Sequence, residues 1–183
     1  MGERETYTVE VAGLTRHLPI FEVAPGVSIA VFNMLGDTEV VKASAAALAE
    51  LLKDQTFDVF VTPEAKSIPL AHELSSMTGI PYIVLRKSRK LYMGETISAE
   101  TVSITTGTPQ TLHLGESDQA ALRAAQVCLI DDVVSTGSTL KGMEAVMDAA
   151  GAQVNAIAAV FTEGDQDWSR ITALGNLPVF INK

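Results

Sequence analysis

The chain has 183 residues, a length that suits one domain able to bury roughly 70% of its unfolded surface without disulfides. Hydrophobic residues make up 47% of it and charged residues 19%, which excludes a disordered chain. The net charge of −9 disfavours general binding to nucleic acid. The single cysteine excludes an internal disulfide, and no apolar run is long enough to span a bilayer. Since the first residues also lack a signal peptide, we expect a cytoplasmic protein that binds neither nucleic acid nor membranes.

The first 35 residues are predicted to form a small β layer, which we call the hood. Residues 6–11 alternate between polar and apolar side chains, and so do residues 27–32. Pro25-Gly26 is typical of a turn between two such strands. We therefore expect residues 1–35 to form the hood and residues 36–183 to form the rest of a single domain.

Beyond the hood, apolar strand patterns alternate with helical ones. Strands are expected at 57–61, 82–85, 127–130, 154–161 and 178–181, and helices at 38–52, 68–77 and 138–150. Asp37 or Thr38 is placed to cap the first helix. Short, wholly apolar strands that alternate with helices are typical of a parallel sheet covered on both faces. The predicted fold class is therefore α/β, with a mainly parallel five-stranded sheet flanked by helices.

Between residues 96 and 115 the alternation of strands and helices is interrupted. Residues 101–105 and 111–114 alternate around a turn-forming segment, residues 107–110, which predicts a β-hairpin standing off the sheet. A hairpin tip that contains Gly and Pro is typical of a mobile element. We expect residues 96–115 to form a flexible lid over a functional site.

One stretch carries the strongest chemical signal in the sequence. The apolar residues 127–130 are followed by Asp131 and Asp132, which we call the acid pair, and then by the small and hydroxyl residues 135–139, which we call the phosphate loop. Ligands of open α/β sheets bind at the carboxyl ends of strands, and free N–H groups at a helix start suit a phosphate. Carboxylates beside a phosphate are tolerated if they hold hydroxyls, a metal or developing positive charge. The stretch therefore indicates a phosphorylated sugar; an ordinary strand-to-helix turn with exposed acids is the alternative.

This stretch resembles the phosphoribosyl-pyrophosphate motif of type I phosphoribosyltransferases. The resemblance implies that Asp131 and Asp132 are catalytic, hold the ribose hydroxyls, favour positive charge at the anomeric carbon and, together with substrate, bind Mg²⁺. The implied ligands of the 5′-phosphate are Ser135, Thr136, Gly137, Ser138 and Thr139. It also implies a homodimeric enzyme that transfers ribose 5-phosphate from phosphoribosyl pyrophosphate to a nucleobase and releases pyrophosphate.

Two further segments resemble the adenine phosphoribosyltransferase branch of that family. Four of the five residues 86–90 are basic, and residues 86–94 are similar to the Arg-Lys-x-Gly-Lys-Leu-Pro-Gly segment of that branch. Residues 62–68 lie where that branch has its Glu-x-Arg-Gly-Phe loop, although Lys66 replaces the Arg and Ser67 replaces the Gly. Cations at a strand end can attract pyrophosphate and stabilise it as a leaving group. The implied pyrophosphate ligands are Glu64, Ala65, Lys66, Ser67, Arg86, Lys87 and Lys90.

The lid and the hood depart from that branch. Its lid carries Glu-Tyr-Gly, whereas Thr105 and Thr106 occupy the corresponding catalytic positions here and cannot supply the carboxylate. Phe32 and Val133 are the candidates for base binding, and Phe32 either stacks on a purine or belongs to the core. Trp168 either borders the base pocket or anchors a surface loop. The resemblance implies an adenine-type purine, but the loss of the hood's Arg and Asp leaves the base open.

A second function stays open because the lid lacks the Glu and Tyr. The chain could be a non-catalytic regulatory protein that senses phosphoribosyl pyrophosphate or a nucleotide. No helix-turn-helix segment is visible in the sequence to support a DNA-binding regulator.

Overall fold

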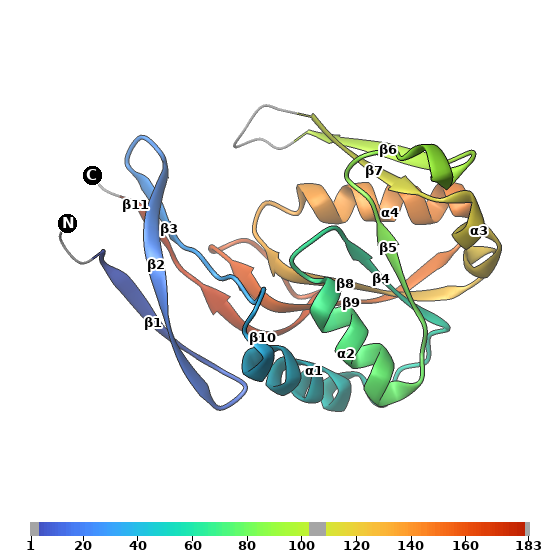
Figure 1. Ribbon diagram of the computed structural model, residues 1–183. Helices are drawn as coiled ribbons and strands as arrows, with labels where there is room; N and C mark the ends of the chain where they lie inside the picture. Colours follow the sequence, from blue (N-terminus) through green and yellow to red (C-terminus); the bar gives the residue numbers. More distant parts are fainter. Residues whose placement is uncertain (1–3, 103–108, 182–183) are drawn as a thin grey trace.

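The computed structural model describes residues 4–102 and 109–181 (Figure 1). Within these ranges, five parallel strands form the central sheet in the order β10–β9–β8–β4–β5. Their bounds are β4 (Val59–Pro63), β5 (Tyr82–Leu85), β8 (Gln126–Val134), β9 (Gln153–Glu163) and β10 (Thr172–Leu177). The predicted five-stranded parallel sheet is confirmed, and β8 extends past Ile130 so that the acid pair lies within the strand.

Helices cover both faces of this sheet. α1 (Thr38–Leu52) and α2 (Ile68–Thr78) lie on one face, and α4 (Ser138–Ala150) lies on the other (Figure 1). A short α3 (Glu116–Leu122) and a single 3₁₀ turn, η1 (Leu91–Met93), complete the helical elements of the described residues. α2 and α4 end at Gly79 and Gly151, both with a φ of 76° in the left-handed region that favours glycine. In the described part of the chain, no helix is both long and apolar enough to cross a membrane.

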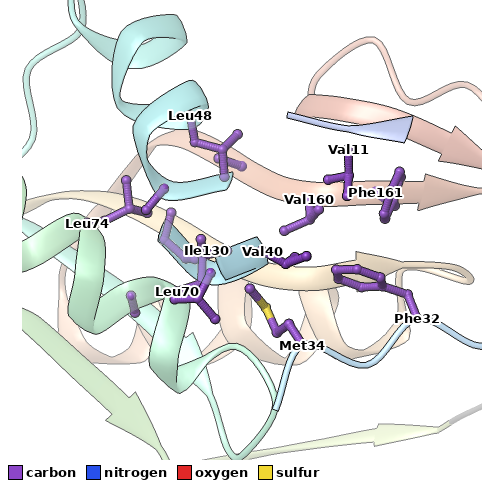
Figure 2. Packing of buried hydrophobic residues seen from close by; sticks show 14 of the residues in the cluster. Val11, Phe32, Met34, Val40, Leu48, Leu70, Leu74, Ile130, Val160 and Phe161 are labelled. Atoms are coloured by element: carbon purple, nitrogen blue, oxygen red, sulfur yellow. The ribbon is translucent and has the colours of Figure 1, made fainter. Parts of the chain in front are cut away.

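The larger hydrophobic core lies between α1, α2 and the sheet and reaches the hood (Figure 2). Leu48 of α1, Leu70 of α2 and Ile130 of β8 are buried there, together with Met34 and Phe161. A second core between the sheet and α4 buries Leu129, Met143 and Val146, among others. These two layers hold the strand ends in fixed positions, which is the condition for a preorganised site.

The hood is a separate antiparallel sheet with strand order β1–β2–β3–β11 (Figure 1). Its strands are β1 (Thr6–Val11), β2 (Leu14–Ala24), β3 (Val27–Ala30) and β11 (Val179–Ile181). The pattern of residues 178–181 predicts a strand of the central sheet; the strand exists as β11 but pairs with β3, so this assignment is wrong. The fifth central strand is instead β10, whose Gly175 and Asn176 weaken its strand signal. Gly175 is required there because a Cβ would approach Phe161 Cε1 to 3.0 Å.

The predicted hairpin is confirmed as a two-stranded antiparallel sheet of β6 (Ile97–Val102) and β7 (Pro109–Leu114). It packs on α4, where the side chain of Thr101 leaves no room for a Cβ at Gly142. Backbone hydrogen bonds of 2.9 and 2.8 Å between Arg86 and His113 also tie β7 to the end of β5. The tip, with Thr105 and Thr106, lies outside the described residues.

An ion pair fastens the hood to the start of α1. Arg16 of β2 donates from Nε to Asp37 Oδ2 at 2.7 Å and from Nη2 to Asp37 Oδ1 at 3.1 Å. Asp37 also caps α1 by accepting a hydrogen bond from Val40 N at 3.1 Å, so it is the predicted capping residue. The hydrogen bonds from Arg16 lower the pKa of Asp37 below its ordinary value.

We expect this pair to make the protein sensitive to acid. A carboxyl whose pKa is lowered by folding contributes stability above its ordinary pKa of about 3.9, and that contribution is lost as the pH falls through the folded pKa. Asp37→Asn keeps a capping side chain but removes the charge. Thermal denaturation should show the variant melting a few degrees below wild type at neutral pH, with the difference closing at low pH. A difference independent of pH would contradict the assignment.

Candidate active site

Three adjoining cavities open where β4, β8 and β9 end at the carboxyl edge of the central sheet. The first, of about 140 Å³, lies between residues 63–67 and the acid pair. The second, of about 30 Å³, lies inside the phosphate loop. The third, of about 180 Å³, lies between β3 of the hood and the core. Val133 lines all three, and Asp132 lines the first and the third, so the cavities form one continuous site.

The second cavity is built from the phosphate loop and the first turn of α4. All five predicted phosphate ligands line it: Ser135, Thr136, Gly137, Ser138 and Thr139. Gly137 has a φ of 72° at the N-cap position of α4, a conformation that favours glycine and turns the following N–H groups toward the cavity's loop. Ser138 N donates to Thr136 Oγ1 at 3.4 Å, and the other N–H groups of the first turn, together with the positive end of the helix dipole, favour an anion at this position.

A segment between β9 and β10 supports the phosphate loop from outside. Gln166 donates a hydrogen bond from Nε2 to Ser135 O at 3.1 Å. The indole ring of Trp168 lies beside Gly137, since a Cβ placed on Gly137 would be 3.9 Å from that ring. The indole N–H of Trp168 donates to Glu163 O at 3.2 Å. Trp168 is half-buried and packs on the core beside α4, so it anchors the exposed loop after β9 and also supports the phosphate loop. It does not line the third cavity.

The acid pair lies at the junction of the cavities, where Asp132 is buried and Asp131 is half-buried. Asp131 Oδ1 accepts hydrogen bonds from Asp132 N at 2.9 Å and from Ser67 Oγ at 3.3 Å. Burial raises the pKa of the Asp131 carboxyl above its ordinary value, and the neighbouring charge of Asp132 raises it further. Asp132 is only 7% exposed, and its Oδ2 has no hydrogen-bond partner among the described residues. Its nearest cation is Lys66, whose Nζ is 3.9 Å from Oδ2. This oxygen is therefore available to a ligand.

Glu64 joins the two predicted pyrophosphate segments. It accepts a hydrogen bond from Lys87 N at 3.0 Å and another from Arg86 Nε at 3.1 Å. The hydrogen bond from the Lys87 backbone lowers the pKa of Glu64, and the Arg86 guanidinium and the charge of Lys90 lower it further. Glu64 therefore stays ionised and holds the basic segment after β5 beside the loop after β4.

The predicted pyrophosphate ligands divide into two groups. Glu64, Ala65, Lys66, Ser67 and Lys87 line the first cavity. Arg86 and Lys90 do not line it, and Arg86 is paired with Glu64. The structure thus brings two ammonium groups to the cavity, those of Lys87 and of Lys66, whose Nζ lies 3.9 Å from Asp132 Oδ2.

The third cavity holds both predicted base ligands and one residue that sequence reasoning missed. Phe32 lines the cavity but is 4% exposed, and its ring meets Phe161 edge-on with centroids 5.0 Å apart, so it is also a core aromatic. Val133 lines the opposite wall. Glu163, at the end of β9, is buried and lines the same cavity. Its signal in the sequence is an apolar run followed by a carboxylate, as residues 127–130 are followed by Asp131.

Comparison with known proteins identifies the family. Residues 33–174 match the model of the phosphoribosyl transferase domain. The chain is 29% identical over 135 residues to the purine biosynthesis transcriptional repressor PurR of Bacillus subtilis, covering 74% of this chain and 47% of that protein. It is 34% identical over 120 residues to a hypoxanthine/guanine phosphoribosyltransferase of Methanocella paludicola, covering 64% of this chain and 59% of the relative. The chain thus spans about half the length of these two relatives.

Among solved structures, the adenine phosphoribosyltransferase of Thermoanaerobacter pseudethanolicus superposes with a TM-score of 0.68 at 25% identity, covering 78% of this chain and 84% of that one. The parallel five-stranded sheet and the position of the phosphate loop after β8 agree with the fold that the sequence predicts. The chain belongs to the phosphoribosyl transferase domain family and has the type I fold, close to the adenine phosphoribosyltransferase branch.

Proposed function

We propose that this protein is a purine phosphoribosyltransferase, which transfers ribose 5-phosphate from phosphoribosyl pyrophosphate to a purine and releases pyrophosphate. The observation that supports the proposal is that three cavities meet at Val133 beside the acid pair, one for each part of the reacting pair. The phosphate loop would hold the 5′-phosphate, the first cavity the pyrophosphate and the third the base. The resemblance adds an adenine-type base and a homodimer to the proposal, and the single cysteine, which fits a reducing compartment, adds a cytoplasmic location.

The residues suit the bond changes of this reaction. A base nitrogen forms a bond to the anomeric carbon, the bond from that carbon to pyrophosphate oxygen breaks with its electron pair, and the base gives up a proton. The buried carboxylate of Asp132 would stabilise the positive charge that develops on the ribose, because charges interact strongly away from water. Lys66 and Lys87 would stabilise the negative charge of the leaving pyrophosphate.

The acid pair fits the magnesium ion that the family implies. Mg²⁺ is bound in proteins by one or two carboxylates together with substrate phosphates and water, and Asp132 Oδ2 is a buried carboxylate oxygen without a hydrogen-bond donor. Among residues 4–102 and 109–181, no three His, Cys, Asp or Glu side chains are grouped as a metal site. Asp131 and Asp132 would therefore hold the ion jointly with the substrate. When bound, the ion would neutralise charge on pyrophosphate.

Two measurements test the proposal. Trp168 is the single tryptophan of the chain and lies against the phosphate loop, so its fluorescence should change on titration with ribose 5-phosphate. Pyrophosphate release should then be measured with phosphoribosyl pyrophosphate, Mg²⁺ and a panel of purine and pyrimidine bases. We expect turnover with at least one purine. Absence of both the fluorescence change and turnover would contradict the proposal.

One observation favours a second candidate, a regulator that binds phosphoribosyl pyrophosphate or a nucleotide without turnover. The chain matches a transcriptional repressor of purine biosynthesis over 135 residues, and the lid lacks the Glu and Tyr of the adenine enzymes. The same two measurements separate the candidates. A fluorescence change without turnover of any base favours the regulator, whereas turnover favours the enzyme.

A further inference from the structure

Residues 164–171, which we call the strap, connect β9 to β10 and lie against the phosphate loop. Most of these residues are exposed, yet the strap is fastened at both ends. Gly164 N donates to Leu177 O of β10 at 2.9 Å. Near the other end, Arg170 forms an ion pair with Glu144 of α4. The strap is therefore held by the central sheet and by the helix that follows the phosphate loop.

Two side chains of the strap contact the phosphate loop. Gln166 donates from Nε2 to Ser135 O at 3.1 Å. The ring of Trp168 lies beside Gly137, and its indole N–H donates to Glu163 O at 3.2 Å, which fixes the ring between the end of β9 and the loop. The second cavity is lined by residues of β8, the phosphate loop and the start of α4, so both contacts reach the loop from outside that cavity.

The hydrogen bond from Gln166 also sets the direction of a donor within the loop. A trans peptide is planar, and its C=O and N–H groups point in opposite directions. The C=O of Ser135 and the N–H of Thr136 belong to one such peptide, so a carbonyl held toward the strap directs this N–H away from it. Both residues line the second cavity. A half-turn of this peptide would exchange the N–H donor for a carbonyl oxygen, which repels a phosphate.

The next peptide, which joins Thr136 to Gly137, needs support of another kind. Glycine populates positive and negative φ about equally, so its own chemistry does not hold Gly137 at the observed φ of 72°. The ring of Trp168 lies 3.9 Å from the position of a Cβ on Gly137 and fills the space on that side of the residue. A loop that spends part of its time in other conformations binds its ligand more weakly, in proportion to the fraction that is competent.

We propose that the strap holds the phosphate loop in the conformation that binds the 5′-phosphate, with Gln166 and Trp168 as its positioning residues. This inference rests on the proposed function. Gln166 keeps the Thr136 N–H directed into the second cavity, and Trp168 keeps Gly137 at positive φ. Both residues act on the affinity for the 5′-phosphate through the loop, and not on the bond changes at the anomeric carbon.

Isothermal titration calorimetry with ribose 5-phosphate tests this inference without requiring turnover. It would compare wild type, Gln166→Met, Trp168→Phe and the matched control Gln55→Met, which makes the same chemical change at an exposed position between α1 and β4. Methionine keeps the length of the glutamine side chain and lacks its N–H donor. We expect Gln166→Met to bind ribose 5-phosphate about 2- to 10-fold more weakly, the range that corresponds to one hydrogen bond. Trp168→Phe loses the indole N–H and should show a similar loss, whereas Gln55→Met should bind as wild type does.

A titration with pyrophosphate and Mg²⁺ distinguishes positioning of the loop from a general structural effect. It is carried out at saturating ribose 5-phosphate, so that the phosphate loop is already occupied. Pyrophosphate would then enter the first cavity, which is lined by residues 63–67, Lys87, residues 131–133 and Thr139. We expect all four proteins to bind it with equal affinity.

The two titrations separate the possible failures. If wild type does not bind ribose 5-phosphate, the proposed function itself is wrong. If wild type binds it and Gln166→Met or Trp168→Phe binds it as tightly, the positioning role of that residue is wrong and the proposed function stands. If a variant loses affinity for both ligands equally, its role is only structural and the inference is again wrong. Circular dichroism of each variant establishes that it is folded.

Discussion

Asp132→Asn should lower kcat by about 100- to 1,000-fold, the range seen when a group that stabilises transition-state charge is removed. The substitution keeps the shape of the side chain and removes the charge that would face the anomeric carbon. It should not unfold the protein. Oδ2 of Asp132 is buried without a hydrogen bond, so losing this charge relieves a desolvation penalty, and the melting temperature should equal or exceed that of wild type.

The test is specific because Asp132→Asn is expected to lower kcat but not the melting temperature. A residue that acts only in packing would lose activity and stability together, whereas a residue of the site can gain stability as it loses activity. Asp54→Asn, at an exposed position after α1, is the matched control for the change in net charge. Steady-state kinetics and thermal denaturation of the three proteins suffice. Unchanged kinetics in Asp132→Asn would count against the whole site.

Lys87→Ala should raise the KM for phosphoribosyl pyrophosphate about 10- to 100-fold, which corresponds to the loss of one charged hydrogen bond. Lys87 lines the first cavity, and within residues 4–102 and 109–181 its hydrogen bond to Glu64 is made by the backbone N–H and not by the ammonium group. The fold therefore keeps this backbone contact in the variant, and the loss is confined to the ammonium group. The KM for the base should change far less, because Lys87 does not line the third cavity.

Lys42→Ala, at an exposed position of α1, is the control for a general effect of charge on substrate attraction. The initial rate should be measured while each substrate is varied at a saturating level of the other. If Lys87→Ala raises the KM for phosphoribosyl pyrophosphate and the KM for the base equally, the assignment of Lys87 to the pyrophosphate site is wrong. The assignment is also wrong if Lys42→Ala raises the KM for phosphoribosyl pyrophosphate as much as Lys87→Ala does.

The parts of the site that could be predicted from the sequence are those that one continuous segment builds. The phosphate loop is such a part, because a buried strand, a glycine with positive φ and a helix start follow one another within residues 127–139. The helices predicted at 68–77 and 138–150 are equally local, and the structure confirms them as α2 and α4, each followed by a glycine with a positive φ. A short segment of sequence contains the whole physical cause of these features.

The parts that could not be predicted depend on partners far apart in the chain. Strand periodicity predicts β11 but not its pairing with β3, some 150 residues earlier. The basic run after β5 predicts a polyanion site, yet Arg86 is paired with Glu64 and does not line the first cavity. Glu163 was passed over because its burial beneath the hood depends on β3 and β10. The division into a hood of residues 1–35 and a remainder stays a prediction, and the hood sheet also includes β11.

The passage from β10 to β11 links base recognition to the position of the hood. Pro178 alone separates the last residue of the central sheet from the hood strand, and its ring fixes one of the two backbone angles at this joint. On the other side of the joint, Leu177 accepts a hydrogen bond from Gly164 N at 2.9 Å and pairs with Glu163. Any tilt of the hood about this joint would therefore act on the end of β9, where Glu163 lines the third cavity.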